Sequence, residues 1–189
     1  MEFVLTDYAK TTPPFAWWDN AFTSEELEVL QRQALSASDD GLAGSGLNKE
    51  IRRSKVAWLN NTQDSQWVYT KLAHVVSSLN SEIYNFSLSG FGEPLQLTNY
   101  NAEDRGTYGW HQDFNGGISR KLSLVMQLTD PEQYEGGSLE LLTSGEPLRI
   151  EKRRGLITLF PSWQLHQVTP VTKGSRQSLV CWITGRPFE

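Results

Sequence analysis

Three residues of this 189-residue chain have the types and the spacing to hold a transition metal. His111 and Asp113 stand two positions apart in the stretch GTYGWHQDFNGG, and side chains at i and i+2 of an extended segment project from the same face. His166 belongs to a later stretch, FPSWQLHQVTP, which antiparallel pairing could place beside them. Two imidazoles and one carboxylate on one face of an ion are a ligand set typical of non-haem Fe(II), with positions left open for oxygen and a chelating molecule.

A surface histidine followed by an acidic turn would give the same H-x-D triplet, so polar residues farther along the chain matter. Arg176 follows His166 by ten residues, beyond the turn-forming VTKG, and a hairpin would return it along the same pocket wall. Its planar guanidinium could clamp a carboxylate in a bidentate pair. Ser178 shares that face of the strand and could donate its hydroxyl to the same anion. These residues favour a site that binds a metal together with a carboxylate.

Two tyrosines precede His111 on segments that we expect to be extended. Tyr100 and Tyr108 could supply phenolic donors or an apolar wall to the pocket, and for each the alternative is core packing with a satisfied polar tip. The remaining histidine, His74, falls on the polar side of a predicted helix with several hydroxyl residues. We therefore interpret His74 as a solvated residue and not as a ligand.

The elements that must position these residues change character near residue 94. Before it, the stretch TSEE at 23–26 has capping-box spacing and predicts a helix from about Ser24 to Leu35. Apolar residues at helical spacing predict a second helix between Ser65 and Tyr84. After it, seven or eight short apolar runs separated by turn residues predict a sandwich or barrel. We predict one α+β domain over residues 1–189, with helical support over about 1–93 and a β-core over about 94–185.

The stretch SASDDGLAGSGLNKE lies between the first helix and the next extended segment. Its serine, aspartate and glycine residues favour loop conformations, so we expect a mobile loop from about Ser36 to Lys49. Low local stability would suit a lid that becomes ordered over the pocket when a substrate binds.

The composition argues against several functions. A net charge of −5 and a pI near 5.3 give no overall basic surface, which disfavours nonspecific nucleic-acid binding as the main activity. The short cluster of Lys49, Arg52, Arg53 and Lys55 is the best argument for a polyanionic partner, but short charge runs are usually solvated faces. The single cysteine, Cys181, cannot form an internal disulfide, and no apolar run is long enough to indicate a membrane span. We expect a soluble, cytoplasmic protein with no membrane partner.

Several stretches of the chain resemble one known family. LQLTNYNAEDRGTYGWHQDF resembles the tyrosine-rich approach and H-x-D of the prolyl 4-hydroxylase-like 2-oxoglutarate/Fe(II) oxygenases. YEGGSLELL, followed by GLITLFPSWQLHQVTPVTKGSRQSLVCWI, is similar to the bacterial PKHD-type branch of that family. RRSKVAWLNN resembles a segment ahead of the catalytic core in prolyl hydroxylases. The matches cover roughly residues 51 to 185, and the ordered set of motifs is more specific than any one of them.

The resemblance implies a fold and a role for individual residues. The expected core is a double-stranded β-helix, or jelly roll, with the N-terminal helices packed on one sheet. His111, Asp113 and His166 would hold the iron, and Arg176 would pair with the distal carboxylate of 2-oxoglutarate. Further co-substrate or pocket contacts are implied for Tyr100, Ser178, Tyr108, Gln127 and Trp182. For Trp182, core packing is almost as good an explanation.

The resemblance also implies a reaction. Fe(II), with 2-oxoglutarate and O2 as co-substrates and ascorbate as a stimulant, would hydroxylate a C–H bond, and a prolyl residue of a peptide or protein is the expected substrate. Other members of the superfamily act on free amino acids, small metabolites or nucleic acids, and a jelly roll can bind a metal without catalysis. The nucleic-acid demethylases resemble a pattern with a second arginine where this chain has Trp182. A non-catalytic metal binder would have little use for Arg176. We therefore expect a peptide or small-molecule substrate.

Overall fold

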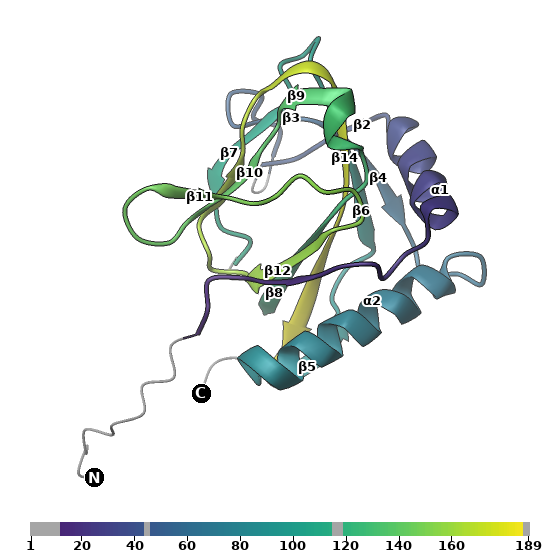
Figure 1. Ribbon diagram of the computed structural model, residues 1–189, viewed down its shortest axis with the longest axis vertical. Coiled ribbons are helices and arrows are strands. Elements are labelled where there is room, and N and C mark those ends of the chain that lie inside the picture. Colours follow the sequence, from purple (N-terminus) through teal and green to yellow (C-terminus); the bar gives the residue numbers. More distant parts are fainter. Residues whose placement is uncertain (1–11, 44–45, 115–118, 187–189) are drawn as a thin grey trace.

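The computed structural model describes residues 12–43, 46–114 and 119–186. The predicted domain also includes 1–11 and 187–189, and the predicted lid includes residues 44–45; these parts lie outside the described residues. Two sheets built from antiparallel pairs face each other, and the helices lie outside the larger sheet (Figure 1). The predicted α+β class with a jelly-roll core is confirmed.

The larger sheet has β14 at its centre. Its described strands run in the order β1 (Ala16–Trp18), β12 (Ile157–Pro161), β8 (Arg120–Gln127), β14 (Val171–Gly185), β6 (Leu95–Asn101), β4 (Lys55–Leu59) and β2 (Asp39–Asp40). Two further strands, β5 (Leu88–Phe91) and β9 (Tyr134–Gly136), also pair with β14. Because β14 is long enough to have several partners, residues from both halves of the chain converge on it.

The smaller sheet carries the histidines. Its described strands run in the order β11 (Pro147–Arg149), β10 (Leu139–Leu142), β13 (His166–Val168), β7 (Thr107–His111) and β3 (Arg52–Arg53). In the antiparallel pair of β7 and β13, His111 stands opposite His166. The two imidazoles are therefore neighbours although 55 positions separate them in the sequence.

Both predicted helices are present. Helix α1 (Ser24–Leu35) begins with the predicted capping box, in which Thr23 and Glu26 bond each other's backbone. Helix α2 (Gln66–Leu79) continues into a short π-helical turn, η1 (Asn80–Tyr84), and a 3-10 turn, η2 (Pro131–Gln133), precedes β9. The apolar faces of α1 and α2 join the core residues of the larger sheet in one cluster. Burial of this cluster holds the helices against the larger sheet, which carries Arg176.

The predicted division of the chain at residue 94 is too simple. Five short strands precede it, and each joins a sheet formed mainly by later residues. Part of the predicted loop is also regular, because Asp39 and Asp40 pair with Val56 and Lys55. Ordering of a lid over 36–49 stays a prediction.

The predicted hairpin between His166 and Arg176 is wrong. The stretch VTKG lies inside β14, and β13 and β14 belong to different sheets, so Arg176 is on the sheet opposite the histidine strand and not beside that strand. Gly174, with φ of +66°, lets the chain continue in β14 where a turn was expected. Turn-forming composition does not specify which strand the chain will join next.

In the part of the chain that the structure describes, no helix is long and apolar enough to cross a membrane.

Candidate active site

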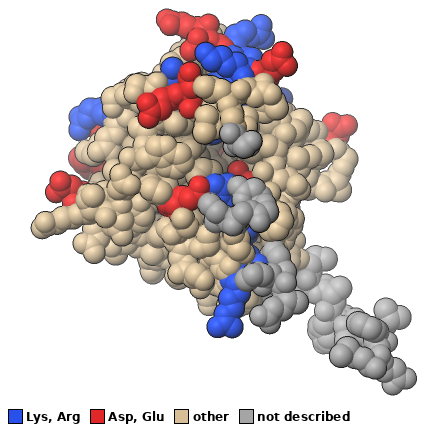
Figure 2. All heavy atoms as spheres, turned by 180° about the vertical axis from the view of Figure 1, so that it is seen from behind, with Lys and Arg blue, Asp and Glu red and all other residues tan. Residues whose placement is uncertain are grey.

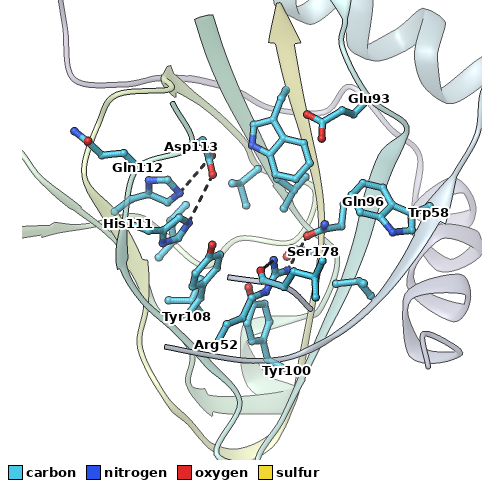
Figure 3. A pocket seen from close by; sticks show the side chains of 18 of the residues that line it. Arg52, Trp58, Glu93, Gln96, Tyr100, Tyr108, His111, Gln112, Asp113 and Ser178 are labelled. Atoms are coloured by element: carbon cyan, nitrogen blue, oxygen red, sulfur yellow. Dashed lines mark hydrogen bonds and ion pairs between the residues drawn. The ribbon is translucent and has the colours of Figure 1, made fainter. Parts of the chain in front are cut away.

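A cavity of about 450 Å³ opens between the two sheets. Its lining includes His111, His166, Asp113, Arg176 and Ser178, together with the apolar side chains of Val125 from the larger sheet and of Leu139 and Val168 from the smaller one. Figure 3 shows His111 and Asp113 on one side of it, and Ser178 and Tyr100 on another. The structure thus brings residues that the sequence indicated as metal and carboxylate ligands to one cavity.

The two histidines and the aspartate form a compact cluster. Nε2 of His111 lies 3.7 Å from Oδ1 of Asp113, and Nε2 of His166 lies 3.5 Å from Oδ2 of the same carboxylate. One potential ligand atom from each residue lies within 4.8 Å of the other two. The register of β7 and β13 sets the distance between the rings, and Asp113 lies two residues beyond the end of β7. These three residues could hold one metal ion.

Neighbouring groups orient each member of the cluster. Nδ1 of His111 lies 2.8 Å from the Gly109 carbonyl oxygen, and Nδ1 of His166 lies 2.8 Å from that of Gln164. A carbonyl accepts a hydrogen bond, so each Nδ1 carries the proton and each Nε2 presents a lone pair to the ion. The Ser123 hydroxyl donates to Oδ2 of Asp113 over 2.7 Å.

The electrostatics of the cluster suit a divalent cation. Burial, assisted by the nearby His166, lowers the pKa of His111 to about 4. Burial acts to raise the pKa of Asp113, but the two histidines and the Ser123 hydroxyl outweigh it and hold that pKa below its usual value. At neutral pH the cluster therefore presents a neutral imidazole at His111 and an ionised carboxylate, the forms that bind metals.

His111 is the first of three stacked side chains that extend away from the cluster. The Tyr108 ring lies 3.5 Å from the imidazole, centroid to centroid, with the planes 12° apart. The Arg52 guanidinium lies 4.6 Å from the centre of the Tyr108 ring. Arg52 also donates to the Gln96 side chain over 2.7 Å and to the Leu42 carbonyl over 2.9 Å. Tyr108 is thus part of the pocket wall, and its ring is held between a cation and a candidate ligand.

The position of Arg52 corrects the sequence interpretation. Its charge cluster was expected to be a solvated face, yet Arg52 is 6% exposed and lines the cavity. The other basic residues of the cluster lie outside: Lys49 and Lys55 pair with Asp40, and Arg53 donates to backbone carbonyls. The sequence of a basic run does not show which of its side chains will point into the protein once strand β3 forms.

On β14, at the other side of the cavity, Arg176 is 1% exposed. Its Nη1 donates to the Ser178 hydroxyl over 3.2 Å, and the Tyr100 ring lies 5.4 Å from its guanidinium carbon. Its Nε and Nη2 have no hydrogen-bond partner among the described residues. Because an unpaired buried guanidinium nitrogen is costly, these atoms mark a place for an anionic ligand.

The remaining candidates differ in position. Trp182 lines the cavity beneath the Arg120 guanidinium, which lies 4.1 Å from the ring centre. Its indole N–H approaches Asp113 without reaching normal hydrogen-bond geometry. Gln127 stands opposite Ser178 in the sheet and is buried, but it is not among the residues that line the cavity.

The sequence did not indicate the residues at the cavity mouth. Arg120 forms a two-bond pair with Glu93, with distances of 2.8 and 2.7 Å, and donates to the Asp113 carbonyl. Trp58, which is half-exposed, packs beside Trp182. No local pattern could have suggested its position, because strict alternation along β8 would place Arg120 on the face of Leu122, which packs in the core, and Glu93 lies 27 positions away in the sequence.

Comparison with known proteins supports the same interpretation. Residues 95–184 match the model of the 2OG-Fe(II) oxygenase superfamily. A PKHD-type hydroxylase of Acidovorax ebreus is 30% identical over 178 residues, which cover 87% of this chain and 75% of that protein. Another, from Teredinibacter turnerae, is 35% identical over 166 residues, covering 84% and 73%. The chain belongs to the PKHD-type hydroxylases. It is therefore a 2-oxoglutarate- and Fe(II)-dependent dioxygenase.

Solved structures share the fold of this PKHD-type hydroxylase. A prolyl hydroxylase from Trichoplax adhaerens, in complex with a hypoxia-inducible-factor peptide fragment, superposes with a TM-score of 0.78 at 18% identity, over 91% of this chain and 84% of that one. A prolyl-4-hydroxylase from Pseudomonas putida gives a TM-score of 0.72 at 18% identity, over 92% and 94%. At these identities the likeness concerns the fold.

Proposed function

We propose that His111, Asp113 and His166 hold Fe(II), that Arg176 and Ser178 bind the distal carboxylate of 2-oxoglutarate, and that the enzyme hydroxylates a prolyl residue in a peptide or protein. One observation carries the assignment of residues. A buried guanidinium, two of whose nitrogens have no hydrogen-bond partner among the described residues, lines the same cavity as a two-histidine, one-carboxylate cluster. A metal-binding protein without a co-substrate would have little use for that guanidinium, because nitrogens buried without a partner are costly.

The donor set fits the two groups. Two imidazoles and one carboxylate suit Fe(II), and a planar guanidinium suits a carboxylate. Once bound, Fe(II) and 2-oxoglutarate would supply the oxidising chemistry with O2 as the oxidant: one oxygen atom of O2 would enter succinate as the oxo acid loses carbon dioxide, and the other would enter the hydroxylated C–H bond. The chain itself orients Nε2 of each histidine, keeps Asp113 ionised and surrounds the reacting centre with Val125, Leu139 and Val168. No side chain is needed as a general base.

The cavity mouth supports a peptide substrate. Trp58 and the Arg120–Glu93 pair provide an aromatic surface with charged groups beside it, which suits a peptide backbone and a proline ring better than a phosphate chain. Figure 2 shows acidic and basic side chains intermixed on the face that it presents, and not a continuous basic surface. This distribution gives little attraction to nucleic acid. The peptide complex of the Trichoplax neighbour adds support by analogy.

The test uses the Fe(II)-loaded protein with 2-oxoglutarate, O2 and ascorbate. Proline-containing peptides and free amino acids, proline included, are incubated in parallel, and mass spectrometry measures the gain of one oxygen atom and the formation of succinate. We expect peptide hydroxylation coupled to succinate in equal amounts, and a rate that falls when ascorbate is omitted. Coupled hydroxylation of a free amino acid instead of any peptide would contradict the peptide assignment and leave the dioxygenase assignment intact.

We also propose that the enzyme works in the cytoplasm. The single cysteine is buried and unpaired, and a reducing compartment keeps iron in the Fe(II) state. Cell fractionation with detection of the native protein checks this location.

A further inference from the structure

A second tyrosine, which the sequence analysis did not single out, lies beside Arg176. Tyr134 begins β9 and stands opposite Gly174 in the pairing of β9 with β14. Positions 174, 176 and 178 of β14 share one face, so Tyr134 occupies the face that carries Arg176 and Ser178. The phenol is 3% exposed. It is thus held inside the protein, on the flank of the guanidinium.

Gly137 brings the two side chains together. A Cβ at this position, where φ is +59°, would lie 3.1 Å from Cδ of Arg176 and 3.2 Å from Cε2 of Tyr134. The backbone therefore runs between the arginine stem and the ring edge, with no room for a larger residue. On the ring face, the Lys152 ammonium lies 4.6 Å from the centroid and donates to the Gly136 carbonyl. Glycine backbone and lysine together fix the Tyr134 ring.

The hydroxyl of this fixed ring is unused. Tyr134 Oη, like Nε and Nη2 of Arg176, has no hydrogen-bond partner among the described residues. The Arg176 guanidinium nevertheless approaches the phenol: through its charge and through a contact that falls short of normal hydrogen-bond geometry, it opposes the rise in the pKa of Tyr134 that burial causes. The phenol oxygen and the two guanidinium nitrogens are buried without a hydrogen bond of normal geometry, which costs free energy. A ligand that aligned these groups would remove that cost.

We propose that Tyr134 is a positioning residue for Arg176. Its hydroxyl oxygen accepts one N–H of the guanidinium, the Ser178 hydroxyl accepts another, and the remaining N–H groups are thereby directed at the distal carboxylate of 2-oxoglutarate. Arg176 carries five N–H donors, and a carboxylate takes two of them in a bidentate pair. Tyr134 thus sets the preference for a dicarboxylic oxo acid. This inference rests on the proposed role of Arg176.

The test compares two oxo acids of equal chain length. The Fe(II) protein is titrated without oxygen with 2-oxoglutarate and with 2-oxovalerate, which has a methyl group in place of the distal carboxylate, and the charge-transfer absorption of the chelate reports each affinity. Tyr134→Phe keeps the ring and removes the hydroxyl. We expect this variant to lower the affinity for 2-oxoglutarate about tenfold, which is the scale of a hydrogen bond to a charged group. The affinity for 2-oxovalerate should be unchanged. The preference for the dicarboxylate then falls by the same factor.

Two further variants complete the design. Tyr84→Phe also removes a buried phenol hydroxyl from a residue that does not line the cavity, but this hydroxyl donates to the Leu159 carbonyl within the core cluster, so the variant should keep the wild-type preference. Arg176→Ala should remove the preference altogether. The inference about Tyr134 is wrong if Tyr134→Phe keeps the full preference for 2-oxoglutarate or lowers the affinity for both oxo acids equally. If Arg176→Ala loses the preference in the same experiment, the role of Arg176 stands. If Arg176→Ala also keeps the preference, both assignments fail.

Discussion

The Tyr108 ring lies flat against the His111 imidazole, with 3.5 Å between centroids and 12° between planes. This contact joins a candidate iron ligand to Arg52, which holds the other side of Tyr108 and bonds the carbonyl of Leu42. A ligand held on one face by a packed ring loses little rotational freedom when it binds a metal. The stack therefore makes a prediction about metal affinity.

Removing the Tyr108 ring should weaken iron binding, whereas removing only its hydroxyl should not. We expect Tyr108→Ala to lower Fe(II) affinity about tenfold, the lower end of the effect of outer-shell changes, and Tyr108→Phe to stay near wild type. Competition with a chromophoric chelator under anaerobic conditions measures both. Equal losses in the two variants would show that the hydroxyl matters and the stacking does not.

Direct loss of a ligand should be more severe. His111→Ala, Asp113→Ala and His166→Ala should each abolish tight Fe(II) binding and the turnover of 2-oxoglutarate while leaving the fold largely intact, because the sheets are held by clusters that do not include these residues. His74→Ala is the matched control, since His74 is an exposed residue of α2. Retained turnover in His166→Ala would contradict the ligand assignment.

The hydroxyl of Ser123 should keep the pKa of Asp113 low and so favour metal binding. Its 2.7 Å hydrogen bond lowers the pKa of that carboxyl, so Ser123→Ala should raise the pKa and weaken Fe(II) binding about tenfold. The loss should grow as the pH falls, because protons then compete better for the carboxylate. Isothermal titration of the metal at several pH values checks this, with the exposed Ser77→Ala as control. An unchanged affinity would mean that the nearby Ser162 replaces the donor.

Arg176 should be required for the co-substrate and dispensable for the metal. Leaving a buried carboxylate without its partner costs about 3–5 kcal/mol, so Arg176→Ala should lower 2-oxoglutarate affinity a few hundred-fold or more. Arg176→Lys keeps the charge without the fork and should fall between Ala and wild type. The anaerobic charge-transfer titration measures all three, and Fe(II) affinity should barely change. Equal 2-oxoglutarate affinities in the three proteins would assign Arg176 a structural role only.

Cys181 should be inert in the native protein. The thiol is fully buried, and burial raises its pKa far above the ordinary value. Because the thiolate is the reactive form, a thiol reagent at about pH 8 should modify the protein only after unfolding in guanidinium. Rapid modification of the folded, iron-loaded protein would show that the centre of the larger sheet opens readily.

Local sequence patterns determined much of this molecule because they depend on near neighbours. The capping box at Thr23 sets the start of α1, and the two-residue spacing of His111 and Asp113 places both on one side of an extended segment. The chemistry of two imidazoles, one carboxylate and a later arginine was also readable, since ligand type depends on residue type.

Only the tertiary structure decided which strands meet. The sequence predicted a hairpin from His166 to Arg176, but β13 and β14 lie in opposite sheets, and the cavity exists because they do. Arg52 looked like part of a charged surface until β3 paired with β7 and placed it over Tyr108. Tyr134 carried no signal until β9 paired with β14. Burial and pairing between residues far apart in sequence are set by the free energy of the whole packed core, which no local spacing encodes.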